Sequence, residues 1–224
     1  QCPAASDAAV GAPLGRASEF QGVVQSISGN TITLAGTPNF TTNAFVYSAG
    51  VQAKTYYLRI DSETKEGLIL PITANGTASV DITIPAGEDL TGVLTNAANG
   101  TGSSVSIAPY WTPSTLITGV VAGTQILLPT ANAGINLAST VYVFNGTNWL
   151  QGATNVNDVI IAPGQGFLLR NNSASVQTIS ITGSVPMSTH RMILRLVTAG
   201  TRQDQRFFYN SPIPETLGSI FGNG

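Results

Sequence analysis

The feature that most constrains this fold is a short recurring pattern, in which apolar and polar residues alternate up to a Gly, Asn or Pro turn. Residues 22–28 and 31–35 flank Gly29-Asn30, a dipeptide typical of a two-residue hairpin loop. Placing Ile27 opposite Ile32 and Gln25 opposite Leu34 gives one mostly apolar face and one hydroxyl-rich face. The segment is therefore predicted to form a half-buried hairpin.

The same pattern predicts strands along most of the chain. Residues 79–84 follow an Asn75-Gly76 turn and alternate strictly between polar and apolar side chains. Further strands are expected at 56–60, 67–73, 104–108, 125–128, 140–144, 147–150, 158–162, 165–170, 176–182, 191–198 and 206–209, with one or two helical turns at 214–221. About a dozen short strands separated by turns predict an all-β fold, an antiparallel β-sandwich or barrel-like structure.

The chain divides into three regions by composition. Residues 1–19 are rich in Ala, Gly and Pro without a clear period, which predicts an extended N-terminal arm. Residues 20–198 form the expected all-β body, with a candidate boundary between two lobes near 109–116. Residues 199–224 are expected to supply a C-terminal strand and a tail.

Charged residues are unusually scarce. They make up 9% of the chain, against 42% hydrophobic residues and a mean hydropathy of +0.20, whereas a typical soluble domain is about a quarter charged. Lys54 and Lys65 are the only lysines. Lysine on edge strands is a main defence against pairing with other chains. This composition favours a subunit whose surface is covered in an assembly.

Charge and hydropathy also argue against two classes of partner. The net charge is −2 and no basic cluster is present, so we expect no binding to nucleic acid. Apolar runs such as residues 68–70 and 167–169 fall far short of the roughly 20 residues of a transmembrane helix. We therefore expect no transmembrane segment.

No motif indicates catalysis or a cofactor. His190 is the only histidine, so a histidine-based triad has one candidate and a metal site has no second histidine. A nucleophile elbow, a phosphate-binding loop and a zinc-protease motif are all missing from the sequence. We expect a protein that is not an enzyme, with no catalytic residues, no cofactor and no metal.

Two groups of side chains, one acidic and one aromatic, have both a structural and a functional interpretation. The acidic residues Asp61, Glu63 and Glu66, and the pair Glu88-Asp89, could bind Ca²⁺ or serve glycoside hydrolysis, but solvated turns explain them more simply. Aromatic residues could instead form a platform that stacks sugars, although aromatics on strands are more often core residues. These aromatic residues are Tyr56, Tyr57, Tyr110, Trp111 and Trp149.

Cys2 is the only cysteine, so an intrachain disulfide is impossible. The functional interpretation is a disulfide to a second subunit or an anchor. The simpler interpretation is a free thiol in the terminal arm.

Several segments of the sequence resemble a known family. They are residues 19–34 (EFQGVVQSISGNTITL), 56–60 (YYLRI), 84–90 (IPAGEDL), 141–149 (VYVFNGTNW), 161–170 (IAPGQGFLLR), 183–186 (GSVP) and 216–220 (TLGSI). Together they resemble an uncharacterised paralogous family of secreted, β-rich proteins from Verrucomicrobia and related bacteria. The resemblance implies export and a β fold, and it supplies no catalytic residues.

Composition and arm together favour a structural subunit of an extracellular filament or surface lattice. Such a homopolymer could form by β-strand complementation, in which a strand of one copy completes a neighbour's sheet. Val10 and Leu14 are the candidate donor-strand contacts, and residues 206–209 with the tail are a second candidate donor. The alternatives are a secreted adhesin or carbohydrate-binding β module and, less favoured, a viral coat protein. The filament subunit and the secreted adhesin or carbohydrate-binding module would both be secreted and lie outside the cell or on the cell surface.

Overall fold

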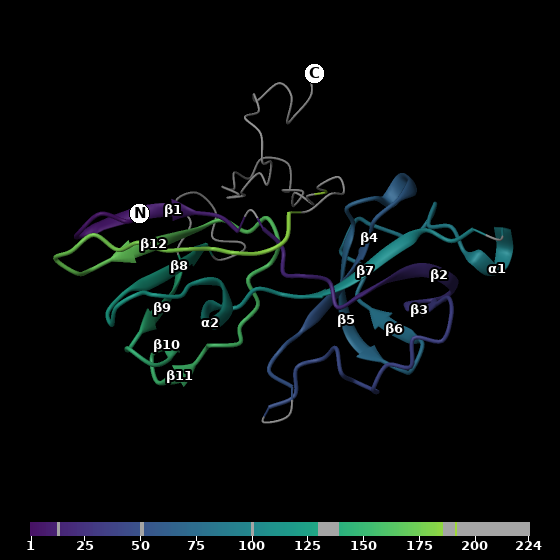
Figure 1. Cartoon of the computed structure of the whole chain (residues 1–224), viewed down its shortest axis with the longest axis horizontal. Helices are drawn as coiled ribbons and strands as arrows, with labels where there is room; N and C mark the ends of the chain where they lie inside the picture. Colours follow the sequence, from purple (N-terminus) through teal and green to yellow (C-terminus); the bar gives the residue numbers. More distant parts are fainter. Residues whose placement is uncertain (13, 50–51, 100, 130–138, 186–190, 192–224) are drawn as a thin grey trace, which may run out of the picture.

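The computed structural model describes residues 1–12, 14–49, 52–99, 101–129, 139–185 and 191, and it confirms the predicted all-β class. Its strands form two groups, a closed barrel and a six-stranded antiparallel sheet, which lie side by side in Figure 1. Helical structure in the described residues is limited to η1 (Glu63–Lys65), α1 (Asn96–Asn99) and α2 (Pro113–Leu116). The expected strand at 191–198, apart from Arg191, lies outside the described residues. So do the expected strand at 206–209, the turns at 214–221, the tail and His190.

The barrel is built by the first half of the chain. Its strands are β2 (Phe20–Ser28), β3 (Thr31–Leu34), β4 (Tyr56–Ile60), β5 (Ile69–Asn75), β6 (Ser79–Ile82) and β7 (Ser104–Pro109). They follow one another in the order β2-β3-β6-β5-β4-β7, and β7 pairs with β2 to close the ring. Closure leaves the barrel without an edge strand.

The predicted hairpin is present with one correction to its register. Ile27 lies opposite Ile32, as expected, and Gly29 has the positive φ of 57° that a type II′ turn requires at its first central position. A bulge follows, however, and Val24 lies opposite Leu34 in place of Gln25. The bulge turns the apolar Val24 into the barrel and keeps the polar Gln25 out of it.

The barrel core follows from the period of two. Inward-facing aliphatic residues alternate along every strand, as Leu58 and Ile60 do on β4 and Val105 and Ile107 do on β7, and all four are at most 1% exposed. At one end of the barrel the rings of Phe20, Phe40, Phe45 and Tyr56 pack in series with centroids 4.9–5.1 Å apart. One continuous apolar core therefore fills the barrel.

The second group of strands, with the segments packed on it, is called the second lobe here. Its strands are β1 (Ser6–Val10), β8 (Gln125–Pro129), β9 (Ser139–Phe144), β10 (Trp149–Gln151), β11 (Thr154–Asn155) and β12 (Phe167–Asn171). They follow the order β1-β12-β8-β9-β10-β11. The chain crosses from the barrel to this lobe after β7 and enters it through α2 (Figure 1). The first strand of the chain is thus an edge strand beside one of the last.

The second lobe has a core of its own. Both tryptophans, Trp111 and Trp149, lie in it, together with Ile126, Phe167 and Leu169. Two segments expected to be strands, 158–162 and 176–182, are irregular and form only isolated bridges. They lie across the core, so their apolar residues, such as Ile161, are buried without a continuous ladder.

No helix among the described residues has the length and apolar character to cross a membrane.

Candidate strand-exchange site

Among the described residues, strand β1 lies at one edge of the second lobe and pairs only with β12. The two strands run antiparallel, from Ser6 opposite Asn171 to Val10 opposite Phe167. Ala8 and Val10 pack against the core, whereas Asp7 and Ala9 are exposed. β1 therefore covers the core with only two small side chains.

Beneath β1, the core side of β12 is fully apolar. Phe167 is 3% exposed and Leu169 is not exposed at all. Removing β1 would uncover this apolar surface and leave the outer backbone groups of β12 without partners, both of which are unfavourable. We call the space that residues 1–10 occupy, on β12 and residues 171–177, the β1 groove.

Asn171 holds the N-terminal end of this segment. Its side chain is fully buried, and its Nδ2 donates to the carbonyl oxygens of Cys2 (3.2 Å), Pro3 (2.8 Å) and Ser175 (2.8 Å). Its Oδ1 accepts hydrogen bonds from the backbone N–H and the hydroxyl of Ser173. A buried amide with both ends satisfied is a rigid contact, because breaking any of these bonds strands a buried polar atom.

Gln177 forms a second layer behind Asn171. Its side-chain amide donates to Asn171 Oδ1 (2.5 Å), and its Oε1 accepts from the hydroxyl of Thr124 (3.1 Å). Its backbone also pairs with Cys2 in both directions, at 2.8 and 2.9 Å. Asn171, Gln177 and Thr124 are all at least 95% buried. Residues 2 and 3 are thus bound mainly through their main chain.

An ion pair holds the middle of β1. Asp7 lies opposite Arg170, whose Nε and Nη2 each donate to one carboxylate oxygen at 2.8 Å. This arrangement is bidentate, which is the most directional form of the pair. Hydrogen bonding and charge from Arg170 lower the pKa of Asp7 and raise the pKa of Arg170.

The ion pair predicts an acid-sensitive strand. Because the pKa of Asp7 is lowered below its ordinary value of 3.8, the stabilisation is complete above that value and is lost as pH falls through the lowered pKa. Opening of β1 should become about two- to fivefold more frequent below the lowered pKa of Asp7 than above pH 3.8. Hydrogen exchange of residues 6–10, corrected for intrinsic rates, measures this. Asp7→Asn should remove the acid response, and an unchanged response in that variant would refute the assignment.

Cys2 is fully buried in the second lobe. Its Sγ lies 3.7 Å from the carbonyl oxygens of Ser6 and Leu169, and its thiol is free. A second subunit has no access to a thiol in this position. The expected disulfide between subunits, or an anchor at Cys2, would require residues 1–10 to leave the groove first.

The two expected donor-strand contacts lie within their own chain. Val10 ends β1 and packs against the second core. Leu14 is half-buried beyond the strand, and its carbonyl oxygen accepts a hydrogen bond from the indole N–H of Trp111 at 2.7 Å. The next residue, Gly15, pairs with Ser184 in both directions. The segment expected to be a free arm is therefore folded onto the second lobe.

The acidic residues are held in ion pairs where the structure shows partners. Asp61 accepts from Arg59 at 2.5 Å, and Lys65 lies between Glu88 (2.9 Å) and Asp89 (3.0 Å). Within the described residues, no group of three or more His, Cys, Asp or Glu side chains is arranged to hold a metal ion. The arrangement joins the turn after β4 to the loop that follows β6.

The five aromatic residues considered for sugar stacking are all in cores or packed junctions. Each is at most 8% exposed, and Trp149 is 1% exposed. Tyr57 and Tyr110 pack together on the outside of the barrel with centroids 4.8 Å apart. These residues cannot form an exposed platform.

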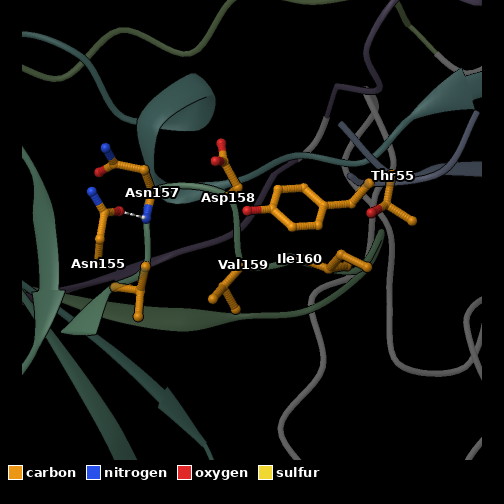
Figure 2. Close-up of a pocket in the computed structure, with 8 residues that line it drawn as sticks. Thr55, Asn155, Asn157, Asp158, Val159 and Ile160 are labelled. Atoms are coloured by element: carbon orange, nitrogen blue, oxygen red, sulfur yellow. Dashed lines mark hydrogen bonds between the residues drawn. The ribbon is translucent and has the colours of Figure 1, made fainter. Parts of the chain in front are cut away.

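A cleft of about 540 Å³ lies where the loop around Tyr47 and Thr55 meets residues 155–160 (Figure 2). Asn155 uses its side-chain oxygen to accept the backbone N–H of Asn157 at 2.9 Å. The side chain of Asn157 accepts the backbone N–H of Trp149 at its Oδ1 and donates from its Nδ2 to Oδ1 of Asn148. Both amides therefore stabilise the loop itself.

Comparison with protein-family models, curated proteins and solved structures finds no match to this chain.

Proposed function

We propose that this protein is a structural subunit of an extracellular homopolymer, a pilus-like filament or surface lattice, in which β1 of one copy occupies the β1 groove of the next. Strand exchange of this kind reuses contacts that already exist within one chain, so it creates no new interface chemistry. The proposal covers no enzymatic role.

One observation carries the proposal. The contacts that hold β1 belong to a ten-residue segment, while the groove that binds it lies far away in sequence. Asp7 and Arg170, for example, are 163 positions apart. An edge strand bound to a groove distant in sequence can be supplied by a second copy, provided that residues 11–15, which also pack on the second lobe, leave it together with β1.

The connection between β1 and the barrel would have to bridge two copies. Residues 11–19 join β1 to β2, and nine extended residues span at most about 30 Å. That reach matches the width of a small domain. If β1 of each copy enters the groove of the next one, the contact is heterologous, and a heterologous contact that does not close generates a fibre.

Exposed apolar side chains support an interface on the same lobe. Among the described residues, the large apolar side chains that are exposed lie in the second lobe, with the exception of Tyr47. They are Val121, Val141, Val159, Ile160, Val176 and Val185. The low overall charge and the resemblance to exported β-rich proteins favour an assembly outside the cell.

Cysteine pairing between two chains tests the exchange. One chain carries Ala9→Cys and the other Leu168→Cys, both in a Cys2→Ser background, because Ala9 and Leu168 lie opposite each other on β1 and β12. Opposed residues on paired strands lie within disulfide range. Mixing the two chains under assembling conditions and oxidising them should yield a disulfide between chains as the main product, read by mass spectrometry.

A matched pair controls for chance contact. Ala9→Cys mixed with Val121→Cys, an exposed position on the same lobe, should give little product. A double variant carrying both Ala9→Cys and Leu168→Cys shows that the pair can form at all. If the double variant closes within a single chain while the mixed chains never join, strand exchange is refuted.

A further inference from the structure

Strand β1 on its own defines its register weakly. Its central residues are Ala8 and Ala9, and a slip of two residues would keep the same alternation of faces. Small side chains on a five-residue strand leave few packing differences between such registers. Apart from the Asp7–Arg170 ion pair, the contacts that fix the alignment of residues 6–10 on β12 must lie outside the strand.

The geometry at Cys2 supplies that constraint. Its side chain fills a closed slot, with Sγ 3.7 Å from the carbonyl oxygens of Ser6, on its own segment, and of Leu169, on β12. The side chain is not exposed at all, so the slot has no opening for a larger group. Asn171 and Gln177 hold the main chain on either side through the bonds described above.

We propose that the β1 groove is a sequence-reading peptide site, in which the Cys2 slot and Asn171 set the register and admit only a small side chain at position 2. The partner that fits is residues 1–10 of a second copy of this chain, with a carboxylate five residues after the small one to meet Arg170. This inference rests on the proposed strand exchange for the identity of the partner. The register rule also applies within one chain.

Two features make the rule selective. A larger side chain at position 2 overpacks a closed slot, which well-packed cores do not absorb. Retreat from the slot would also break the bonds from Asn171 to the carbonyl oxygens of Cys2 and Pro3, leaving a buried amide without acceptors. A slip in either direction incurs both penalties, and it separates Asp7 from Arg170.

A peptide in trans tests the rule without demanding that a variant protein fold. The probes are synthetic peptides of residues 1–12 with Ala9→Cys, carrying Ser or Leu at position 2, and the target is the full chain with Leu168→Cys and Cys2→Ser. The Ser peptide should form the mixed disulfide at least about tenfold more efficiently than the Leu peptide. A peptide with Gln1→Leu and Ser at position 2 places the leucine at the exposed neighbouring position and should match the Ser peptide. Substantial and equal yields for the Ser and Leu peptides would overturn the proposal.

A second measurement separates this rule from strand exchange. Two double variants of the full chain report the register. Ala9→Cys with Leu168→Cys forms a disulfide in the native register (the matched pair), and Ala9→Cys with Arg170→Cys forms one after a slip of two residues (the offset pair). Replacing Cys2 by Leu should lower the yield of the matched disulfide and raise the yield of the offset disulfide. Replacing it by Ser should leave the matched pair dominant. If peptides never enter the groove but this series discriminates, the register rule stands and exchange fails. If the Leu series keeps the matched register, the rule fails whatever the outcome for exchange.

Discussion

A chain lacking residues 1–10 is expected to lose the cooperative fold of the second lobe while the barrel stays folded. The deletion removes the pairing of β1 with β12, which comprises five residue pairs, empties the Cys2 slot and uncovers Phe167 and Leu169. It also takes two acceptors from the buried amide of Asn171, and a buried unsatisfied group costs about 1–3 kcal/mol. The summed loss is comparable to the whole stability of a domain, about 5–15 kcal/mol.

The two tryptophans make the unfolding of the second lobe measurable, because both lie in its core. Their fluorescence should report an unfolded or loosened lobe in the truncated chain, while far-ultraviolet circular dichroism keeps a barrel transition. Added peptide of residues 1–12 should restore the tryptophan signal and raise its melting temperature with concentration, as a ligand of the native state does. A truncated chain with the full-length tryptophan melt would contradict the role given to β1.

Leu58→Ala should destabilise the barrel by about 2–5 kcal/mol and leave the second lobe nearly unchanged. Leu58 is not exposed at all, and truncating a buried leucine combines lost burial with a cavity. The barrel transition in circular dichroism should shift to lower denaturant, with the tryptophan transition in place. Leu169→Ala, fully buried in the other core, should give the converse pattern.

Val121→Ala serves as the surface control, because Val121 is 47% exposed and its truncation should change stability by no more than about 0.5 kcal/mol. If Leu58→Ala and Leu169→Ala shift both transitions together, the two cores unfold as one unit. The separation of the barrel from the second lobe would then have no thermodynamic meaning.

The hairpin of β2 and β3 shows what the sequence pattern can specify. Gly29-Asn30 fixed the turn, and the facing pair of Ile27 and Ile32 followed from it. The bulge at Gln25 was not predictable, because the alternation pattern does not show that an extra residue lies in the strand. Only the tertiary structure shows that Val24 faces the barrel core. Alternation identifies a strand, but the partner strands decide where it bends.

Strand β1 was missed for a different reason. Ser6 to Val10 contains two alanines and an aspartate, all of them poor strand formers, so propensity favoured an irregular arm. The pairing with β12 and the Asp7–Arg170 ion pair override that propensity. Residues 158–162 and 176–182 show the reverse error, because their apolar content reflects burial across the core without pairing in a ladder.

The polar half of the candidate site had no sequence signal of its own. Asn171 stands in an Asn-Asn-Ser stretch that is typical of turns, and Gln177 looks like a polar position on a strand. Their role depends on a contact with Cys2 that spans more than 160 positions along the chain. Only Cys2 was singled out beforehand, and its thiol is free but buried in the second lobe.

The closed barrel also limits how many neighbours one subunit can hold. Every barrel strand has its hydrogen-bonding capacity used on both sides, so this half offers no growth site. In the part of the chain that the structure describes, the second lobe has one long edge, at β1, and its opposite edge is the two-residue strand β11. If strands are exchanged as proposed, each copy donates one strand and receives one, so it contacts two neighbours. Subunits with two neighbours would add in single file, and the proposal therefore predicts linear growth without branching.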